Sequence, residues 1–100
     1  ALGERLDLPM DQVVEALRGG AAGSWALEHR APGMLRGSYP LGFRLALHHK
    51  DLGIALDAAE SVQLELPISR LVQQLEHALM QRGHGDEDVS ALHRLHDEKS

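Results

Sequence analysis

The stretch that decides the fold runs from Arg44 to Ser61 and reads RLALHHKDLGIALDAAES. Its apolar residues return at the spacing of a helix, so we predict one long helix across it. The apolar set of this helix consists of Leu45, Leu52, Ala55, Leu56, Ala59 and, just beyond its end, Val62.

The composition extends this prediction to the whole chain. Leucine and alanine together fill thirty of the 100 positions, only seven residues are valine or isoleucine, and threonine and asparagine are absent. Leucine and alanine favour helices, whereas strands favour β-branched and aromatic side chains. We therefore expect an all-α fold, and the length fits one compact multi-helix domain.

Charge and hydropathy argue against several classes of protein. The net charge of -5 argues against nucleic-acid binding, because phosphate contacts need clustered lysine and arginine. No apolar run approaches the ~18–20 residues that span a bilayer, which argues against a membrane protein. Without cysteine the chain can form neither disulfides nor thiolate metal sites, so we expect a cytoplasmic protein.

Two more helices are expected before the long one. Pro9 can occupy the first position of a helix that continues over residues 10–17 and stops at Gly19. Ser24 can cap the next helix, which we expect Pro32-Gly33 to perturb. A loop follows over residues 37–42.

The segment after the long helix predicts a second amphipathic helix and a short last one. Leu66-Pro67 begins a helix whose apolar face repeats every three or four residues, and Gly83 ends it. A turn follows at residues 83–85. Asp88 or Ser90 could cap a final short helix that continues through Leu95.

The first residues, Ala1 to Leu6, read as the last turns of a helix, with Leu2 and Leu6 on one face. So short a helix is unstable alone. We therefore expect the chain to be a fragment whose upstream helix has been cut, and a frayed start is the alternative.

Lys50 is the most unusual residue of the long helix. Arginine occurs eight times and lysine twice, so a lysine here is not the chain's ordinary surface cation. It lies between Leu47 and Ile54 on a partly apolar strip, from which its ammonium group could reach a phosphate or a ribose hydroxyl. An ordinary amphipathic lysine is the alternative. Asp51 points about 100° away along the helix, so the two are not a mutual ion pair, and water is its default partner.

Other chemistry-bearing patterns are weaker. The glycines between Gly19 and Ser24 are explained by a helix stop and a cap, because neither a preceding strand nor a following lysine supports a phosphate loop. Seven histidines include the pairs His48-His49 and His93-x-x-His96, but three or four converging ligands are not evident. We expect no metal site and no nucleophilic serine.

Three longer sequence segments resemble those of a known protein family. Residues 18–27 read RGGAAGSWAL, residues 42–52 read GFRLALHHKDL and residues 88–92 read DVSAL. In this order, over essentially the whole chain, they resemble the C-terminal domain of the β-hydroxyacid dehydrogenases, the family of 3-hydroxyisobutyrate dehydrogenase. The sequence of residues 42–52 is more similar to that of tartronate semialdehyde reductase than to that of 3-hydroxyisobutyrate dehydrogenase.

The resemblance implies that residues 1–100 form a C-terminal helical domain, like that of 6-phosphogluconate dehydrogenase-like enzymes, which supports oligomers. The family's Rossmann domain and catalytic lysine lie upstream, so no catalytic residue is expected within these 100 residues. Lys50 matches the lysine that contacts the cofactor, NAD or NADP. Phe43 and Asp51 match residues that line the pocket for a small hydroxyacid.

Two functions follow as hypotheses. One is the helical domain of an NAD(P)-dependent oxidoreductase that interconverts a small β-hydroxyacid and its semialdehyde. Its partners would be its own Rossmann domain and further copies of the same protein. The other is a free-standing helical module that binds a partner helix in a groove.

Overall fold

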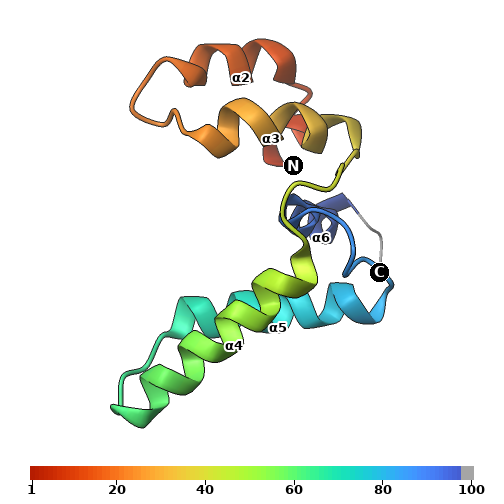
Figure 1. Ribbon diagram of the computed structural model, residues 1–100. Coiled ribbons are helices and arrows are strands. Elements are labelled where there is room, and N and C mark those ends of the chain that lie inside the picture. The colour runs from red at the N-terminus through yellow and green to blue at the C-terminus, as the bar shows by residue number, and fades with distance from the viewer. Residues whose placement is uncertain (98–100) are drawn as a thin grey trace. The chain divides into compact units, whose positions relative to one another are not determined.

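The computed structural model describes residues 1–97, and this part of the chain is helical with no strand (Figure 1). One isolated antiparallel bridge joins Arg44 to Asp88. The predicted helical class is confirmed. The elements in order are α1 (Leu2–Arg5), α2 (Met10–Arg18), α3 (Trp25–Arg36), α4 (Leu45–Ser61), α5 (Pro67–Gln81), the 3-10 helix η1 (Val89–His93) and α6 (Arg94–Asp97).

The elements group into two compact units. One unit contains residues 1–40 together with the described residues from His93 onward, and in it α2 packs against α3. The other unit, Leu41–Leu92, is built on the packing of α4 against α5. The candidate site residues Phe43, Lys50 and Asp51 all belong to this second unit.

Local signals fix most helix ends of the first unit as expected. Helix α2 ends at Arg18 with Gly19 as its C-cap, and its first residue is Met10, with Pro9 as the N-cap. The Ser24 hydroxyl accepts a hydrogen bond of 3.0 Å from the amide of Leu27, which confirms the predicted cap.

Pro32 and Gly33 do not end the third helix, since α3 runs through both residues, and the expected perturbation is limited to the helical hydrogen bond that Pro32, having no amide N–H, cannot donate. Gly37 closes the helix in the left-handed conformation, with φ 67°, and the amide of Ser38 bonds the carbonyl of Gly33 at 2.9 Å. This closure satisfies carbonyls of the last turn. It also brings the Ser38 carbonyl so close that a side chain at position 33 would meet it at 2.7 Å.

The second unit has a small core between α4 and α5. Leu45, Leu56 and Ala59 of α4 are buried, as is Leu79 of α5. Two members of the apolar set expected for α4 lie outside this core, since Ala55 is exposed and Val62 is 70% exposed. They follow the helical spacing, but the partner helix does not cover their side of α4.

Helix α5 shows the same feature, since the side chains of Ile68 and Leu71 are exposed although they belong to its apolar face. The unit thus presents more apolar surface than its own core uses. Within residues 1–97 no helix is both long and apolar enough to cross a bilayer.

Candidate functional site

The three site residues expected from the sequence lie along one stretch of the second unit. Phe43 stands just before α4, and Lys50 and Asp51 stand two turns further, about 10 Å along the axis at 1.5 Å per residue. All three are exposed, and so are Leu47 and Ile54, which share this side of the helix. We call these five residues the α4 face.

Lys50 and Asp51 both point away from the rest of their unit. Neither side chain forms a hydrogen bond or an ion pair with any residue of the described part of the chain. The expectation that they are not a mutual ion pair therefore holds within residues 1–97. A cation and a carboxylate without partners remain available for a ligand.

Phe43, in contrast, is firmly held through its backbone. One oxygen of Asp88 accepts hydrogen bonds from the amides of Gly42 at 3.1 Å and Phe43 at 2.8 Å. The Phe43 carbonyl accepts a 2.7 Å hydrogen bond from the amide of Val89. The chain before α4 is thus tied to the segment before η1, 45 residues later in the sequence.

Asp88 is the residue that makes this tie. It is 2% exposed, and its second oxygen accepts hydrogen bonds from the amide and the hydroxyl of Ser90. The sequence correctly suggested that it caps the last helical segment. Sequence reasoning missed its contact with residues 42 and 43, because no local pattern relates positions so far apart.

The ring of Phe43 also has a neighbour within the unit. The imidazole of His48 lies perpendicular to it, with 6.0 Å between the ring centroids. Nδ1 of His48 is 2.7 Å from a carboxylate oxygen of Glu76, a residue of α5 that is completely buried. The sequence analysis did not single out Glu76, and a charged residue inside an apolar helical repeat is the signal that could have revealed it.

One member of each histidine pair considered as metal ligands, His48 or His93, has another partner. His48 bonds Glu76, and in the first unit Nδ1 of His93 lies 3.1 Å from Asp97 and 3.2 Å from the hydroxyl of Tyr39. Potential ligand atoms of Glu4, His93 and Asp97 lie within 4.8 Å of one another. Within this group Nδ1 of His93 has Asp97 as a neighbour, and Glu4 lies 3.5 Å from the amino terminus of Ala1.

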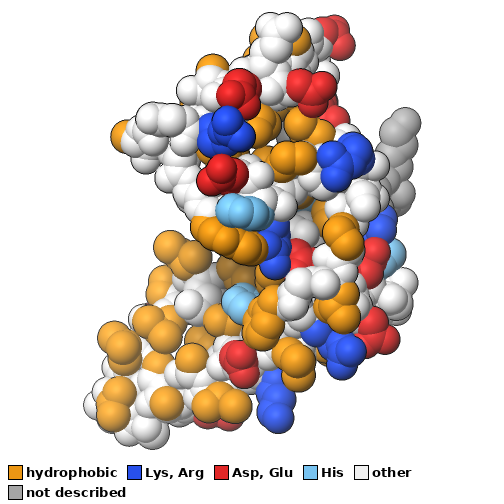
Figure 2. Space-filling model, turned by 45° about the horizontal axis from the view of Figure 1, so that its top comes forward, with side chains coloured by type: hydrophobic (Ala, Val, Ile, Leu, Met, Phe, Trp, Pro, Cys, Tyr) orange, Lys and Arg blue, Asp and Glu red, His pale blue; other side chains and the backbone are white. Residues whose placement is uncertain are grey.

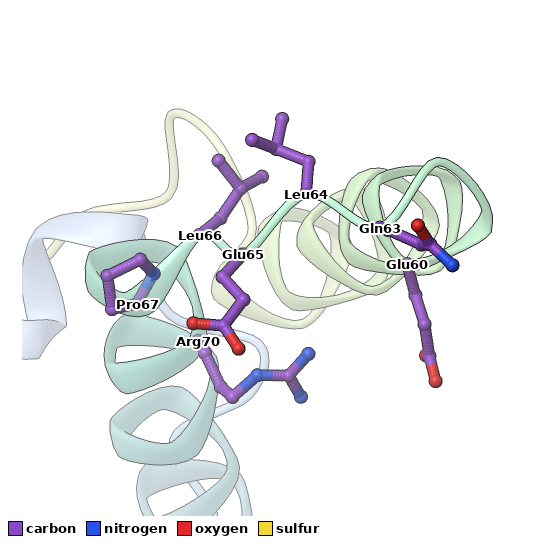
Figure 3. A pocket seen from close by; sticks show the side chains of 7 residues that line it. All are labelled: Glu60, Gln63, Leu64, Glu65, Leu66, Pro67 and Arg70. Atoms are coloured by element: carbon purple, nitrogen blue, oxygen red, sulfur yellow. The ribbon is translucent and has the colours of Figure 1, made fainter.

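A hollow of about 560 Å³ lies elsewhere, beside the loop between α4 and α5 (Figure 3). In Figure 3 the side chains of Leu64 and Leu66 point to one side of the loop, and those of Glu65 and Arg70 point to the other. None of the three expected site residues lines this hollow. The open α4 face is therefore a separate surface from this hollow.

The α4 face has the chemistry that a nicotinamide cofactor and a small polar substrate require. An ammonium group suits phosphate or ribose oxygens, a carboxylate suits substrate hydroxyls, and an aromatic ring excludes water. Three exposed apolar side chains, Phe43, Leu47 and Ile54, flank these charges. The residues present thus fit such a ligand.

Comparison with known proteins identifies the family. A family profile described as the NAD-binding domain of NADP-dependent 3-hydroxyisobutyrate dehydrogenase matches residues 1–96. This chain belongs to that family. The family member 2-hydroxy-3-oxopropionate reductase of Escherichia coli is 38% identical over 81 residues, which are 81% of this chain and 28% of the relative.

Two other members of the 3-hydroxyisobutyrate dehydrogenase family extend the match to almost the whole chain. The L-threonate dehydrogenase of Cupriavidus necator is 34% identical over 95% of this chain and 32% of its own length. The crystal structure of a 3-hydroxyisobutyrate dehydrogenase from Salmonella typhimurium superposes with a TM-score of 0.82 at 26% identity, over 94% of this chain and 33% of that one.

The matched relatives are longer than this chain and differ in the substrates that their names give. The chain spans about a third of the length of the relatives it matches. The names of these relatives cover different hydroxyacids at similar identity, so membership of the 3-hydroxyisobutyrate dehydrogenase family fixes the class of protein and not the substrate.

Proposed function

We propose that residues 1–100 are the C-terminal helical domain of an NAD(P)-dependent β-hydroxyacid dehydrogenase, and that the α4 face closes over the cofactor and the substrate. A Rossmann domain with the catalytic lysine would form the remainder of the enzyme, since the relatives are about three times as long as the matched region. The observation that carries the proposal is that the exposed, unpartnered Lys50 lies along the same stretch as the firmly held Phe43, about two helical turns further on.

Each residue of the α4 face has a defined task in this proposal. Lys50 binds a phosphate or ribose oxygen of the cofactor, because a lysine offers a compact charge with three donors. Phe43 forms an apolar wall that keeps water out, and Asp51 accepts hydrogen bonds from substrate hydroxyls. Hydride transfer is the chemistry that the nicotinamide supplies when it is bound. The helical domain contributes orientation and water exclusion.

The proposed substrate is a small semialdehyde of the tartronate or 3-hydroxyisobutyrate type, which would be reduced to its hydroxyacid. The sequence of residues 42–52 and the similarity to 2-hydroxy-3-oxopropionate reductase support the first of these. Membership of an oxidoreductase family favours this proposal over a free-standing interaction module.

An assay of the full-length gene product tests the proposal. We expect it to oxidise NADH or NADPH with tartronate semialdehyde, and to reduce NAD or NADP with 3-hydroxyisobutyrate or L-threonate more slowly. The 100-residue chain alone should show no turnover. Full-length protein that turns over none of these substrates, or turnover by the chain alone, would contradict the assignment.

A second expectation concerns self-association. Exposed apolar side chains gather on the part of the second unit formed by the end of α4 and the start of α5, toward the lower left in Figure 2. They are Val62, Leu64, Ile68 and Leu71. Exposed apolar patches above a few hundred Å² often bind a partner, and the charge of -5 opposes this only weakly at physiological salt.

We therefore expect the chain to be at least a dimer, with a second copy covering this patch. Sedimentation velocity at tens of micromolar should give a species of twice the 10.9 kDa monomer mass or more. An Ile68→Glu substitution should shift the chain toward monomer, whereas Glu60→Gln should not. A single monomeric species for the unsubstituted chain would show that this expectation is wrong.

A further inference from the structure

Glu76 is a buried charge that the family assignment does not explain. Its side chain on α5 is fully buried, and burial of a carboxylate is costly unless strong hydrogen bonds compensate for it. Only one of its oxygens has a hydrogen-bond partner, Nδ1 of His48 at 2.7 Å. The other oxygen lies 4.0 Å from Nδ1 of His49, and both of these buried atoms lack a hydrogen-bond partner.

This incomplete pairing argues against a purely stabilising role. A well-packed apolar residue often stabilises such a position as well as, or better than, a buried ionic group. A glutamate that leaves one oxygen unsatisfied therefore gives up stability. Its hydrogen bond is to His48, so Glu76 acts most directly on that imidazole, and a longer contact of 4.0 Å joins it to Nδ1 of His49.

The hydrogen bond constrains the His48 ring. As an ionised carboxylate, Glu76 accepts it from an Nδ1–H of His48, and the contact holds the plane of the ring. The ring stands perpendicular to that of Phe43, at 89° and 6.0 Å between centroids. This is a favourable edge-to-face arrangement of two aromatic rings.

The two buried carboxylates of this unit thus act on the same residue. Asp88 fixes the backbone of Phe43 by accepting its amide, and Glu76 fixes its ring through His48. The acids come from positions 76 and 88, on different segments, and both converge on the start of α4. Phe43 itself is 39% exposed and is the only phenylalanine of the chain.

We propose that Glu76 and His48 are a positioning pair that sets the orientation of the Phe43 ring and thereby the fit of the small semialdehyde substrate. The link to the substrate rests on the proposed function, whereas the link from Glu76 to Phe43 does not. The positioning pair should therefore affect the KM for the semialdehyde. It should leave the KM for the cofactor, which depends on Lys50, within about twofold.

Nuclear magnetic resonance on the 100-residue chain tests the link without any activity. With ring-labelled phenylalanine, only Phe43 gives ring signals. Glu76→Leu and His48→Ala should each shift these signals. In Glu76→Leu, the nuclear Overhauser contacts between the rings of Phe43 and His48 should also be lost. Glu76→Gln keeps an acceptor for Nδ1, so it should retain the contacts. Gln74→Ala, at an exposed position of the same helix, is the control and should leave the Phe43 signals unchanged.

Nitrogen-15 spectra of labelled histidine should also show the Nδ1–H tautomer for His48 in the unsubstituted chain and its loss in Glu76→Leu. Phe43 signals that are unchanged in a folded Glu76→Leu variant would overturn the proposal. If that variant fails to fold, the His48→Ala variant decides in the same way.

Kinetics on the full-length enzyme test whether the positioning pair affects the fit of the semialdehyde substrate. Glu76→Leu should raise the KM for the semialdehyde about fivefold or more with an unchanged cofactor KM, and Glu76→Gln should restore most of the loss. An unchanged semialdehyde KM in an active enzyme overturns the inference and leaves the proposed function standing. If the full-length protein reduces no semialdehyde, the proposed function fails, and the resonance experiment still decides whether Glu76 and His48 position Phe43.

Discussion

Replacing Asp88 with alanine should remove about 3 kcal/mol from the free energy of unfolding of the unit formed by residues 41–92. The carboxylate of Asp88 is 2% exposed and accepts four hydrogen bonds, from two amides before α4 and from the amide and hydroxyl of Ser90. Its removal leaves buried donors without an acceptor, and each such donor costs about 1–3 kcal/mol unless water reaches it. Against a total stability of about 5–15 kcal/mol for a typical domain, this loss is large.

The neighbouring Asp86 provides the matched control. Its side chain is 94% exposed and lies 3.5 Å from Arg44, an exposed ion pair of the kind that contributes little to stability. Urea unfolding followed by circular dichroism, with hydrogen exchange of the Leu45 and Ala46 amides, should separate the variants. Equal stabilities of Asp88→Ala and Asp86→Ala would show that Asp88 does not anchor the start of α4.

The sequence predicted the helices of this fold well because their signals are local. Ser24 caps its helix, Gly19 stops another, and the proline at position 67 begins α5. The continuation of α3 through Pro32 did not follow from the sequence, because a proline inside a helical repeat ordinarily marks a break or a kink.

Burial was harder to predict than helix position. The helical repeat shows which residues share a face, but it does not show how much of that face a partner helix covers. Val62 and Ile68 follow the repeat and are 70% and 78% exposed. Glu76 shares its helix with Leu79 and is as deeply buried, although its charge suggests a surface position. Its hydrogen-bond partner in the structure, His48, lies 28 residues away in the sequence.

The candidate site was only partly predictable. The sequence and the family resemblance identify Phe43, Lys50 and Asp51, which the structure places along one exposed stretch. The supports of Phe43, namely Asp88 and the pair of Glu76 and His48, depend on contacts between residues far apart in the chain. The helical repeat could have marked Glu76 as unusual, but no spacing rule relates these residues to Phe43.

Replacing Lys50 with alanine in the full-length enzyme should raise the KM for the nicotinamide cofactor about 10- to 100-fold, with a much smaller change in kcat. A hydrogen bond to a charged group contributes about 1.5–3 kcal/mol, and each 1.4 kcal/mol corresponds to about a tenfold change in affinity. The effect should appear in the cofactor KM because the proposed contact is with a phosphate or ribose oxygen and not with the transferred hydride. Lys50→Met keeps the aliphatic stem and should behave like alanine, which separates charge from packing.

Direct binding of the cofactor to the full-length protein tests the central claim most simply. Titration calorimetry or nicotinamide fluorescence should show weakening of about 10-fold or more for Lys50→Ala. Arg70→Ala, which removes an exposed cation of the neighbouring helix α5, should bind like the unsubstituted protein. If Lys50→Ala binds NADH and NADPH as tightly as the Arg70→Ala control does, the α4 face is not where this domain meets the cofactor.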